Sequence, residues 1–125
     1  MQLRPTSLDH VVLTVADVER SLAWYAGKLG LVGERLDEWR RGEVPFPSVR
    51  IDSTTIIDLV QGERSGQNVD HLCLVVEPVD LDAVAASGDF DVVGGPGTRF
   101  GARGDGVSLY VLDPDGNMIE LRHYA

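Results

Sequence analysis

Apolar and polar residues alternate in the same order in the two halves of the chain. An apolar run follows an Asp-His pair at residues 8–15, and again at residues 69–76. Short apolar runs bounded by polar residues are typical of strands. The histidines of the two pairs, His10 and His71, are 61 residues apart (71 minus 10) in a chain of 125 residues. The pattern therefore predicts an internal repeat of one structural module.

A helix is predicted after each of these strands. Asp17 is a favourable N-cap, and Gly30 is suited to end the helix that follows it. Between them, four apolar residues have the spacing of one helix face, namely Val18, Leu22, Tyr25 and Leu29. Asp80 and Gly88 bound a shorter segment with the same start and stop signals.

Three strand-like segments follow each helix. The turn signal Asp-Pro-Asp-Gly-Asn at residues 113–117 precedes the last of them, because proline presets one φ and glycine accepts a positive φ. Each half is therefore βαβββ, with module 1 at about residues 6–62 and module 2 at about residues 69–125. We expect a single α+β domain whose two tandem modules form a curved mixed sheet with the helices outside. The expected strands are residues 33–41, 44–52 and 54–61 in the first half, and residues 90–93, 106–112 and 118–123 in the second.

Superposing the two modules brings out a candidate site. His10 pairs with His71, and one gap in the last strand pairs Asp58 with Glu120. Each carboxylate interrupts an apolar strand, and a buried charge is costly unless it is paired or bound to a metal. Two histidines with one or two carboxylates suit Zn, Ni, Mn, Fe(II) or Co, whereas Ca²⁺ prefers oxygen ligands alone. We therefore predict a divalent metal ion held by His10, His71 and Glu120.

Asp58 is a candidate fourth ligand. Its side chain is one methylene shorter than that of glutamate, so its reach to a shared metal is less. A salt bridge from Asp58 to Arg50 or Arg122 is the alternative interpretation of this buried carboxylate.

Composition narrows the classes of partner. The chain has 11 basic and 20 acidic residues and a net charge of −9, so nucleic acid and anionic membrane are unfavourable partners. No apolar run approaches the roughly 18 residues of a membrane-spanning helix, and the first residues lack the apolar stretch of a signal peptide. We expect a cytoplasmic protein. The one cysteine, Cys73, lies in an apolar run and is expected in the core.

These motifs resemble those of the vicinal oxygen chelate superfamily. The similarity covers essentially the whole chain and is clearest in Leu-Asp-His-Val-Val-Leu at residues 8–13 and in Asp-Pro-Asp-Gly-Asn-Met-Ile-Glu-Leu at residues 113–121. The superfamily includes glyoxalase I, fosfomycin-resistance transferases, extradiol dioxygenases and bleomycin-resistance proteins. The resemblance implies a homodimer in which His10 of one subunit joins His71 and Glu120 of the other. The metal would act as a Lewis acid on a small oxygen-rich substrate.

The individual activities of the superfamily each add residues of their own. Thr14 stands where glyoxalase I has an arginine that holds glutathione. Phe100 stands near the position of the phosphonate-binding lysine of the fosfomycin transferases, although Ser108 and Tyr110 resemble theirs. Extradiol dioxygenases are mostly about twice as long and need a further histidine and tyrosine in the pocket. The resemblance therefore implies a metal-dependent lyase or transferase of glyoxalase type, in which Glu120 or Asp58 moves a proton.

Sequestration of a drug or natural product without chemistry is the alternative. Bleomycin-resistance proteins bind a cationic drug, and their acidic dimers are similar to this chain in charge. The glycine-rich residues 101–106 are either a mobile lid over a pocket or a hairpin loop. In either case the small molecule would contact candidate pocket residues, namely Ser108, Tyr110, Arg103 and Trp39.

Overall fold

The computed structural model describes residues 1–112 and 116–125, which divide into two compact units. The C-terminal unit comprises residues 1–9 and 71–125, and the N-terminal unit comprises residues 10–70. The first three residues of the expected turn at 113–117 lie outside the described residues. The elements in chain order are β1 (Pro5–Val15), α1 (Val18–Leu29), β2 (Val32–Glu34), α2 (Leu36–Arg40), β3 (Ser48–Arg50), β4 (Ile56–Gln61), β5 (Val69–Val76), α3 (Leu81–Ala86), β6 (Asp91–Gly101), β7 (Gly104–Leu112) and β8 (Met118–His123).

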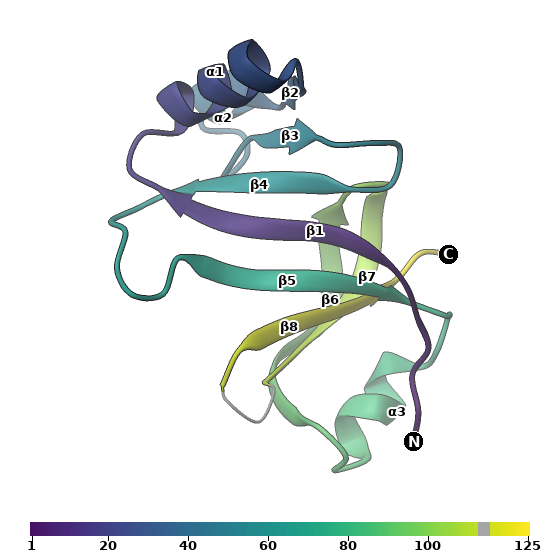
Figure 1. Cartoon of the computed structure of the whole chain (residues 1–125). Coiled ribbons are helices and arrows are strands. Elements are labelled where there is room, and N and C mark those ends of the chain that lie inside the picture. The colour runs from purple at the N-terminus through teal and green to yellow at the C-terminus, as the bar shows by residue number, and fades with distance from the viewer. Residues whose placement is uncertain (113–115) are drawn as a thin grey trace. The chain divides into compact units, whose positions relative to one another are not determined.

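The N-terminal unit is a small mixed sheet with α1 against it. Its strands lie in the order β2-β3-β4-β1, in which β1 pairs with β4 in parallel and the other pairs are antiparallel (Figure 1). Leu22 of α1 packs with Val49 and Leu59 of the sheet, and these buried side chains form the core of the unit. Burial of this apolar face stabilises the helix more than its intrinsic propensity does.

Helix α1 begins and ends where the sequence predicts. The Asp17 side chain accepts a hydrogen bond of 3.0 Å from the Arg20 N–H, and Gly30 adopts the left-handed conformation at φ 70°. The chain then returns close under the helix, since a Cβ added at Gly33 would lie 2.7 Å from the Leu22 side chain. A residue without a side chain at position 33 therefore allows β2 to approach α1.

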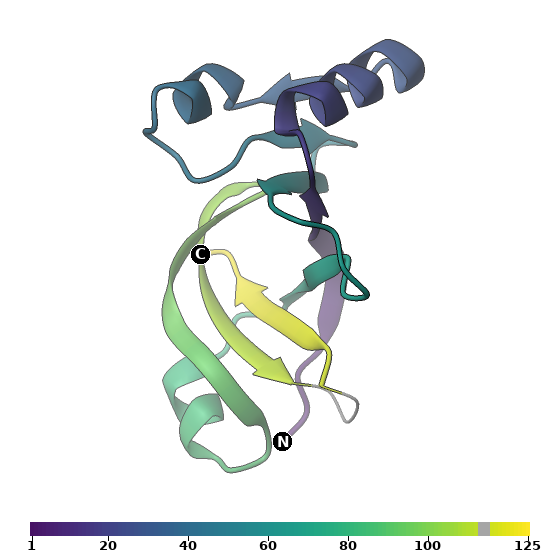
Figure 2. The same cartoon turned by 90° about the vertical axis from the view of Figure 1, so that its left-hand side faces the viewer.

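The C-terminal unit has the same plan. Its strands lie in the order β5-β8-β7-β6, with β5 parallel to β8 and the other pairs antiparallel. Helix α3 lies against β6 and β7, as Figure 2 shows at the lower end of these long strands. Asp80 caps α3 by accepting hydrogen bonds from the N–H groups of Asp82 and Ala83. The core contains six buried side chains: Val76, Leu81, Val84, Leu109, Val111 and Leu121.

The first residues of β1 belong to the C-terminal unit. The Glu77 N–H donates to the Arg4 carbonyl at 3.1 Å, and the Thr6 hydroxyl donates to the Val75 carbonyl at 3.3 Å. β1 therefore begins against the end of β5, and its later residues from His10 to Val15 pair with β4.

The α+β class and the tandem repeat are confirmed. In each unit a strand and a helix are followed by three strands, with α2 inserted between the first two of these in the N-terminal unit, and the last strand returns parallel to the first. The outer pairs are antiparallel in both units, so each sheet is mixed. The boundaries of the two modules and their union in one domain remain predictions.

Three of the expected strands differ in the structure. The strand expected at 33–41 is wrong in its second half, where α2 forms instead. Asp37 and Glu38 lie in the first turn of α2, where negative charge is favourable. The strand expected at 44–52 is reduced to β3, because Pro45 and Pro47 precede it and proline has no N–H to donate to a sheet.

The strand expected at 90–93 instead extends to Gly101 as β6. Residues 94–97 contain three glycines and one proline, and the strand passes through them with two shifts in register. Gly95 has a φ of 77°, and a Cβ there would lie 2.5 Å from the Ser108 carbonyl oxygen. Glycine therefore permits the irregular backbone that keeps β6 paired with β7.

Two predictions from composition can also be compared with the structure. Cys73 is fully buried, as expected. Within residues 1–112 and 116–125, no helix combines the length and apolar character needed to cross a membrane. The cytoplasmic location stays a prediction.

Candidate metal centre

The registers of the two parallel strand pairs are the same at the candidate ligands. In the N-terminal unit Asp58 lies opposite Val12, two residues after His10. In the C-terminal unit Glu120 lies opposite Cys73, two residues after His71. Side chains two residues apart on a strand point to the same face, so each histidine lies diagonally across from its carboxylate. The gap that pairs Asp58 with Glu120 in the sequence therefore agrees with the strand register.

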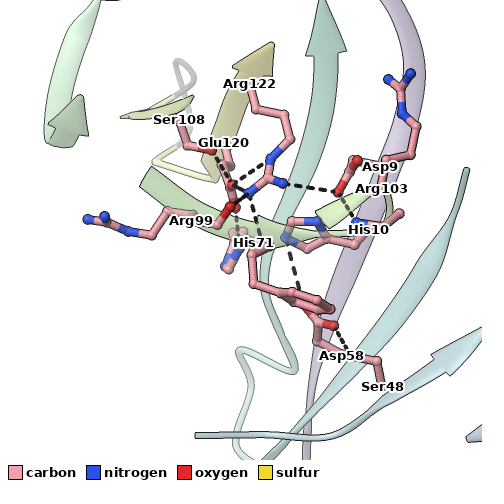
Figure 3. Close-up of polar contacts among 12 residues, drawn as sticks. Asp9, His10, Ser48, Asp58, His71, Arg99, Arg103, Ser108, Glu120 and Arg122 are labelled. Carbon is pink, nitrogen blue, oxygen red and sulfur yellow. Dashed lines mark hydrogen bonds and ion pairs between the residues drawn. The ribbon is translucent and has the colours of Figure 1, made fainter. Parts of the chain in front are cut away.

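The N-terminal unit brings His10 and Asp58 together. Both side chains are nearly inaccessible, and His10 Nε2 lies 3.8 Å from Asp58 Oδ2 (Figure 3). The other carboxylate oxygen, Oδ1, accepts a hydrogen bond of 2.5 Å from the hydroxyl of Ser48, which lies directly opposite Asp58 on β3. The separation of 3.8 Å is too long for a hydrogen bond, so the two side chains interact as charges when His10 is protonated.

The C-terminal unit brings His71 and Glu120 closer. His71 Nε2 lies 3.0 Å from Glu120 Oε1, and the Glu120 side chain is 1% exposed. Two ligand atoms about 2.0–2.2 Å from one metal ion and at right angles to each other are separated by about 3.0 Å. The pair is thus hydrogen-bonded as it stands, and its spacing also fits two adjacent positions on one metal ion.

The second oxygen of Glu120 is surrounded by donors. Oε2 accepts hydrogen bonds from the Ser108 hydroxyl at 2.7 Å, from Arg122 Nη2 at 2.9 Å and from Arg122 Nε at 3.3 Å (Figure 3). In the β7–β8 register Ser108 lies opposite Arg122 and Tyr110 lies opposite Glu120, so these four side chains share one face of the sheet. The strands alone therefore assemble this cluster.

Arg122 is the largest of the fully buried side chains. Its Nη1 donates to the Tyr124 hydroxyl oxygen at 2.9 Å, and its Nη2 also donates to the carbonyls of Arg99 and Phe100 at 3.2 and 3.0 Å. Burial is the largest single influence on the pKa of Arg122 and would lower it, but the negative charge of Glu120 and the hydrogen bond to Tyr124 together raise the pKa above its usual value. The guanidinium therefore stays charged and compensates Glu120.

Asp9 contacts the same cluster of buried polar side chains through Tyr124. The Tyr124 hydroxyl donates to Asp9 Oδ1 at 2.5 Å, and the Ala102 N–H donates to Asp9 Oδ2 at 3.0 Å. Burial, followed by the hydrogen bond to Asp9, raises the pKa of Tyr124. Ala102 and Arg103 are the two residues between β6 and β7, and the Arg103 N–H donates to the Tyr124 oxygen at 3.3 Å. The glycine-rich segment is thus a tight hairpin whose turn is hydrogen-bonded to Asp9 and Tyr124.

The four candidate pocket residues lie in different surroundings. Ser108 is buried against Glu120, and the ring of Tyr110 lies edge-on to His71 at 5.6 Å and beneath the Arg99 guanidinium at 5.9 Å. The guanidinium of Arg103 stacks on Tyr124 at 4.3 Å. Trp39 lies half-buried on α2 in the N-terminal unit. Their contact with a small molecule remains a prediction.

The structure assigns partners to both arginines that the sequence offered for Asp58. Arg122 forms an ion pair with Glu120, and Arg50 forms one with Glu34 at 3.0 Å. Sequence reasoning missed Ser48, Asp9 and Tyr124 as members of the two clusters. Asp9 precedes a candidate ligand, and Ser48 lies within the strand expected at 44–52, but only the tertiary structure shows that the Ser48 hydroxyl reaches Asp58 and that the Tyr124 hydroxyl reaches Asp9.

Comparison with known proteins supports the fold and the class. The model of the Glyoxalase/Bleomycin resistance protein/Dioxygenase superfamily matches residues 7–121. The Glyoxalase domain-containing protein RDO1 of Mycosarcoma maydis is 30% identical over 136 residues, which cover 98% of this chain and 71% of that protein. The chain therefore belongs to the Glyoxalase/Bleomycin resistance protein/Dioxygenase superfamily.

Two solved structures share the fold. The methylmalonyl-CoA epimerase from Mycobacterium tuberculosis is 24% identical with a TM-score of 0.61, and the match covers 97% of this chain and 89% of that chain. The Mn(II)-bound glyoxalase from Novosphingobium aromaticivorans is 19% identical with a TM-score of 0.68, and the match covers 98% of this chain and 40% of that chain. The glyoxalase structure contains Mn(II), and the epimerase has a different activity from the glyoxalase, so proteins with this fold differ in the reaction they catalyse.

Proposed function

We propose that the protein is a metal-dependent enzyme of glyoxalase type, a lyase or transferase that acts on a small oxygen-rich substrate. The observation that supports this most is the contact of 3.0 Å between His71 Nε2 and Glu120 Oε1, which matches adjacent ligand positions on one ion. The same histidine-carboxylate pair occurs at the equivalent register in the N-terminal unit, as His10 and Asp58. A pair built once could be an ordinary ion pair, whereas a buried pair kept in both repeats is typical of a ligand set.

In this proposal His10, His71 and Glu120 are metal ligands, and Asp58 is the candidate fourth ligand. A divalent metal would polarise a carbonyl or an enediolate of the chelated substrate. The residues of the chain would bind the ion, orient the substrate beside it and move a proton at Glu120 or Asp58. Tyr110 packs against His71 and would form an aromatic wall next to the substrate. The proposal includes a homodimer, which light scattering on the purified protein would test.

Metal content of the purified protein tests the proposal directly. We expect one divalent metal ion per chain after loading with Zn, Ni, Mn, Fe(II) or Co and desalting, and loss of the metal in His71→Ala. His123→Ala is the matched control, because His123 follows Glu120 by three residues on β8, so its side chain is on the opposite face of the strand and its loss should leave metal uptake unchanged. A wild-type protein that takes up none of these metals, or a His71→Ala variant that takes up as much as wild type, would refute the proposal.

Drug sequestration is distinguished by the same preparation. Bleomycin, as the probe, should bind equally tightly before and after EDTA treatment if the protein sequesters a cationic drug. Metal-dependent binding of small oxygen-rich compounds, with no EDTA-resistant bleomycin binding, is expected for the proposed enzyme.

A further inference from the structure

The two oxygens of Glu120 have different surroundings in the C-terminal unit. Oε1 faces His71 Nε2 at 3.0 Å. Oε2 accepts three hydrogen bonds, one from Ser108 and two from Arg122, at 2.7, 2.9 and 3.3 Å. A carboxylate oxygen has two lone pairs, so these donors occupy the capacity of Oε2. Glu120 therefore has one oxygen oriented toward the candidate ligand His71 and one oxygen whose lone pairs are occupied by Ser108 and Arg122.

Arg122 has little freedom to leave this position. Its side chain is fully buried, and besides Glu120 it contacts the Tyr124 hydroxyl and two carbonyls of β6. Gly101, at the end of β6, lies against the guanidinium: a Cβ added there would be 1.7 Å from Arg122 Nη1. The guanidinium therefore occupies the space that a side chain at position 101 would need, and glycine at this position makes room for it.

Tyr124 extends this support to the start of the chain. Its hydroxyl accepts from Arg122 Nη1 and donates to Asp9 Oδ1, while Arg122 Nη1 also lies 3.9 Å from Asp9 Oδ2. On one side the guanidinium is thus held by Tyr124, whose hydroxyl is in turn hydrogen-bonded to Asp9. On the other side it contacts Glu120 directly. Two N–H groups of one guanidinium, Nε and Nη2, donate to the same Glu120 oxygen, and this fixes orientation as well as charge.

We propose that Arg122, together with Ser108, holds Glu120 as a one-oxygen metal ligand: they occupy Oε2, so that only Oε1 is offered to the ion. This rests on the proposed function. Arg122 is a positioning residue, since it acts through Glu120 and does not touch the ion. Without it, Oε2 is released and Glu120 can coordinate through both oxygens, which raises the coordination number of the metal.

The visible spectrum of the Co²⁺-loaded protein reports this change, because the spectrum of Co²⁺ depends on its coordination geometry. We expect the molar absorptivity of the visible Co²⁺ band to fall about twofold in Arg122→Gln, as the coordination number rises. Ser108→Ala should move the spectrum in the same direction by a smaller amount, because one donor of three is lost. Arg41→Gln is the matched control: it makes the same substitution at an exposed arginine that pairs with Glu43 at 3.0 Å, and neither residue is a candidate ligand or pocket residue, so its spectrum should equal that of wild type.

The outcomes separate this proposal from the proposed function. Arg122→Gln leaves Glu120 without its cation and could fail to fold, so Arg122→Lys and Ser108→Ala are measured beside it, with circular dichroism to verify folding. If folded Arg122 and Ser108 variants bind Co²⁺ with the wild-type spectrum, the role of Arg122 is refuted while the metal site stands. If the wild-type protein takes up no Co²⁺, the proposed function is refuted, and the role of Arg122 with it.

Discussion

Gly101→Ala is expected to cost the protein a large part of its stability, although it adds one methyl group. Gly101 does not adopt a positive φ, so the backbone accepts alanine there, and the whole cost comes from the contact of the new Cβ with Arg122. That Cβ would be 1.7 Å from Arg122 Nη1, 2.6 Å from its Cζ and 2.5 Å from the Tyr124 oxygen. Atoms that are not bonded to each other need about 3.5 Å, so the guanidinium must withdraw by almost 2 Å.

Such a movement breaks the ion pair of 2.9 Å between Arg122 and Glu120, in which both side chains are buried. Separating one partner from a buried charged pair costs about 3–5 kcal/mol, because the other charge is left without compensation. A typical domain is stable by about 5–15 kcal/mol, so we expect Gly101→Ala to lose about a fifth of that stability or more.

Urea unfolding followed by circular dichroism measures this loss. Gly27→Ala is the matched control, since Gly27 lies inside α1 and no atom is within 4 Å of the added Cβ. Alanine favours the helix over glycine, so the control should gain about 0.5–1 kcal/mol. The reasoning is refuted if Gly101→Ala stays within about 1 kcal/mol of wild type while Gly27→Ala is stabilised as expected.

Two further predictions follow from the buried network of the C-terminal unit. Ser108→Ala should lower the free energy of unfolding by about 1.5–3 kcal/mol, because it removes a hydrogen bond to a buried carboxylate, and a loss below about 0.5 kcal/mol in urea titrations would contradict this. The raised pKa of Tyr124 means that its neutral form is the one the fold stabilises, so this stability is fully present below the pKa of an unfolded tyrosine and is lost as pH rises through the higher folded pKa. The unfolding temperature of wild type should therefore fall more steeply with rising alkaline pH than that of Tyr124→Phe. Equal slopes of unfolding temperature against pH for the two proteins would show that Tyr124 does not contribute.

The sequence alone determined the repeat, the order of elements in it and the residue types of the candidate site. Asp17, Gly30 and Asp80 act locally, through hydrogen bonds or dihedral angles within a few residues, so their roles could be read from the chain. The pairing of His10 with His71 and of Asp58 with Glu120 also followed from the sequence, because a duplicated module repeats its strand register.

The tertiary structure decided which groups surround these residues. Helix α2 replaced an expected strand, and β6 continued through a glycine-rich segment, because pairing and packing with neighbouring elements outweighed local preference. Asp9 and Tyr124 are 115 residues apart in the sequence and share a hydrogen bond of 2.5 Å, which no local sequence pattern predicts. Arg122 appeared in the sequence as a partner for Asp58, yet strand alternation places it two residues from Glu120 on the same face, where a buried carboxylate needs its charge.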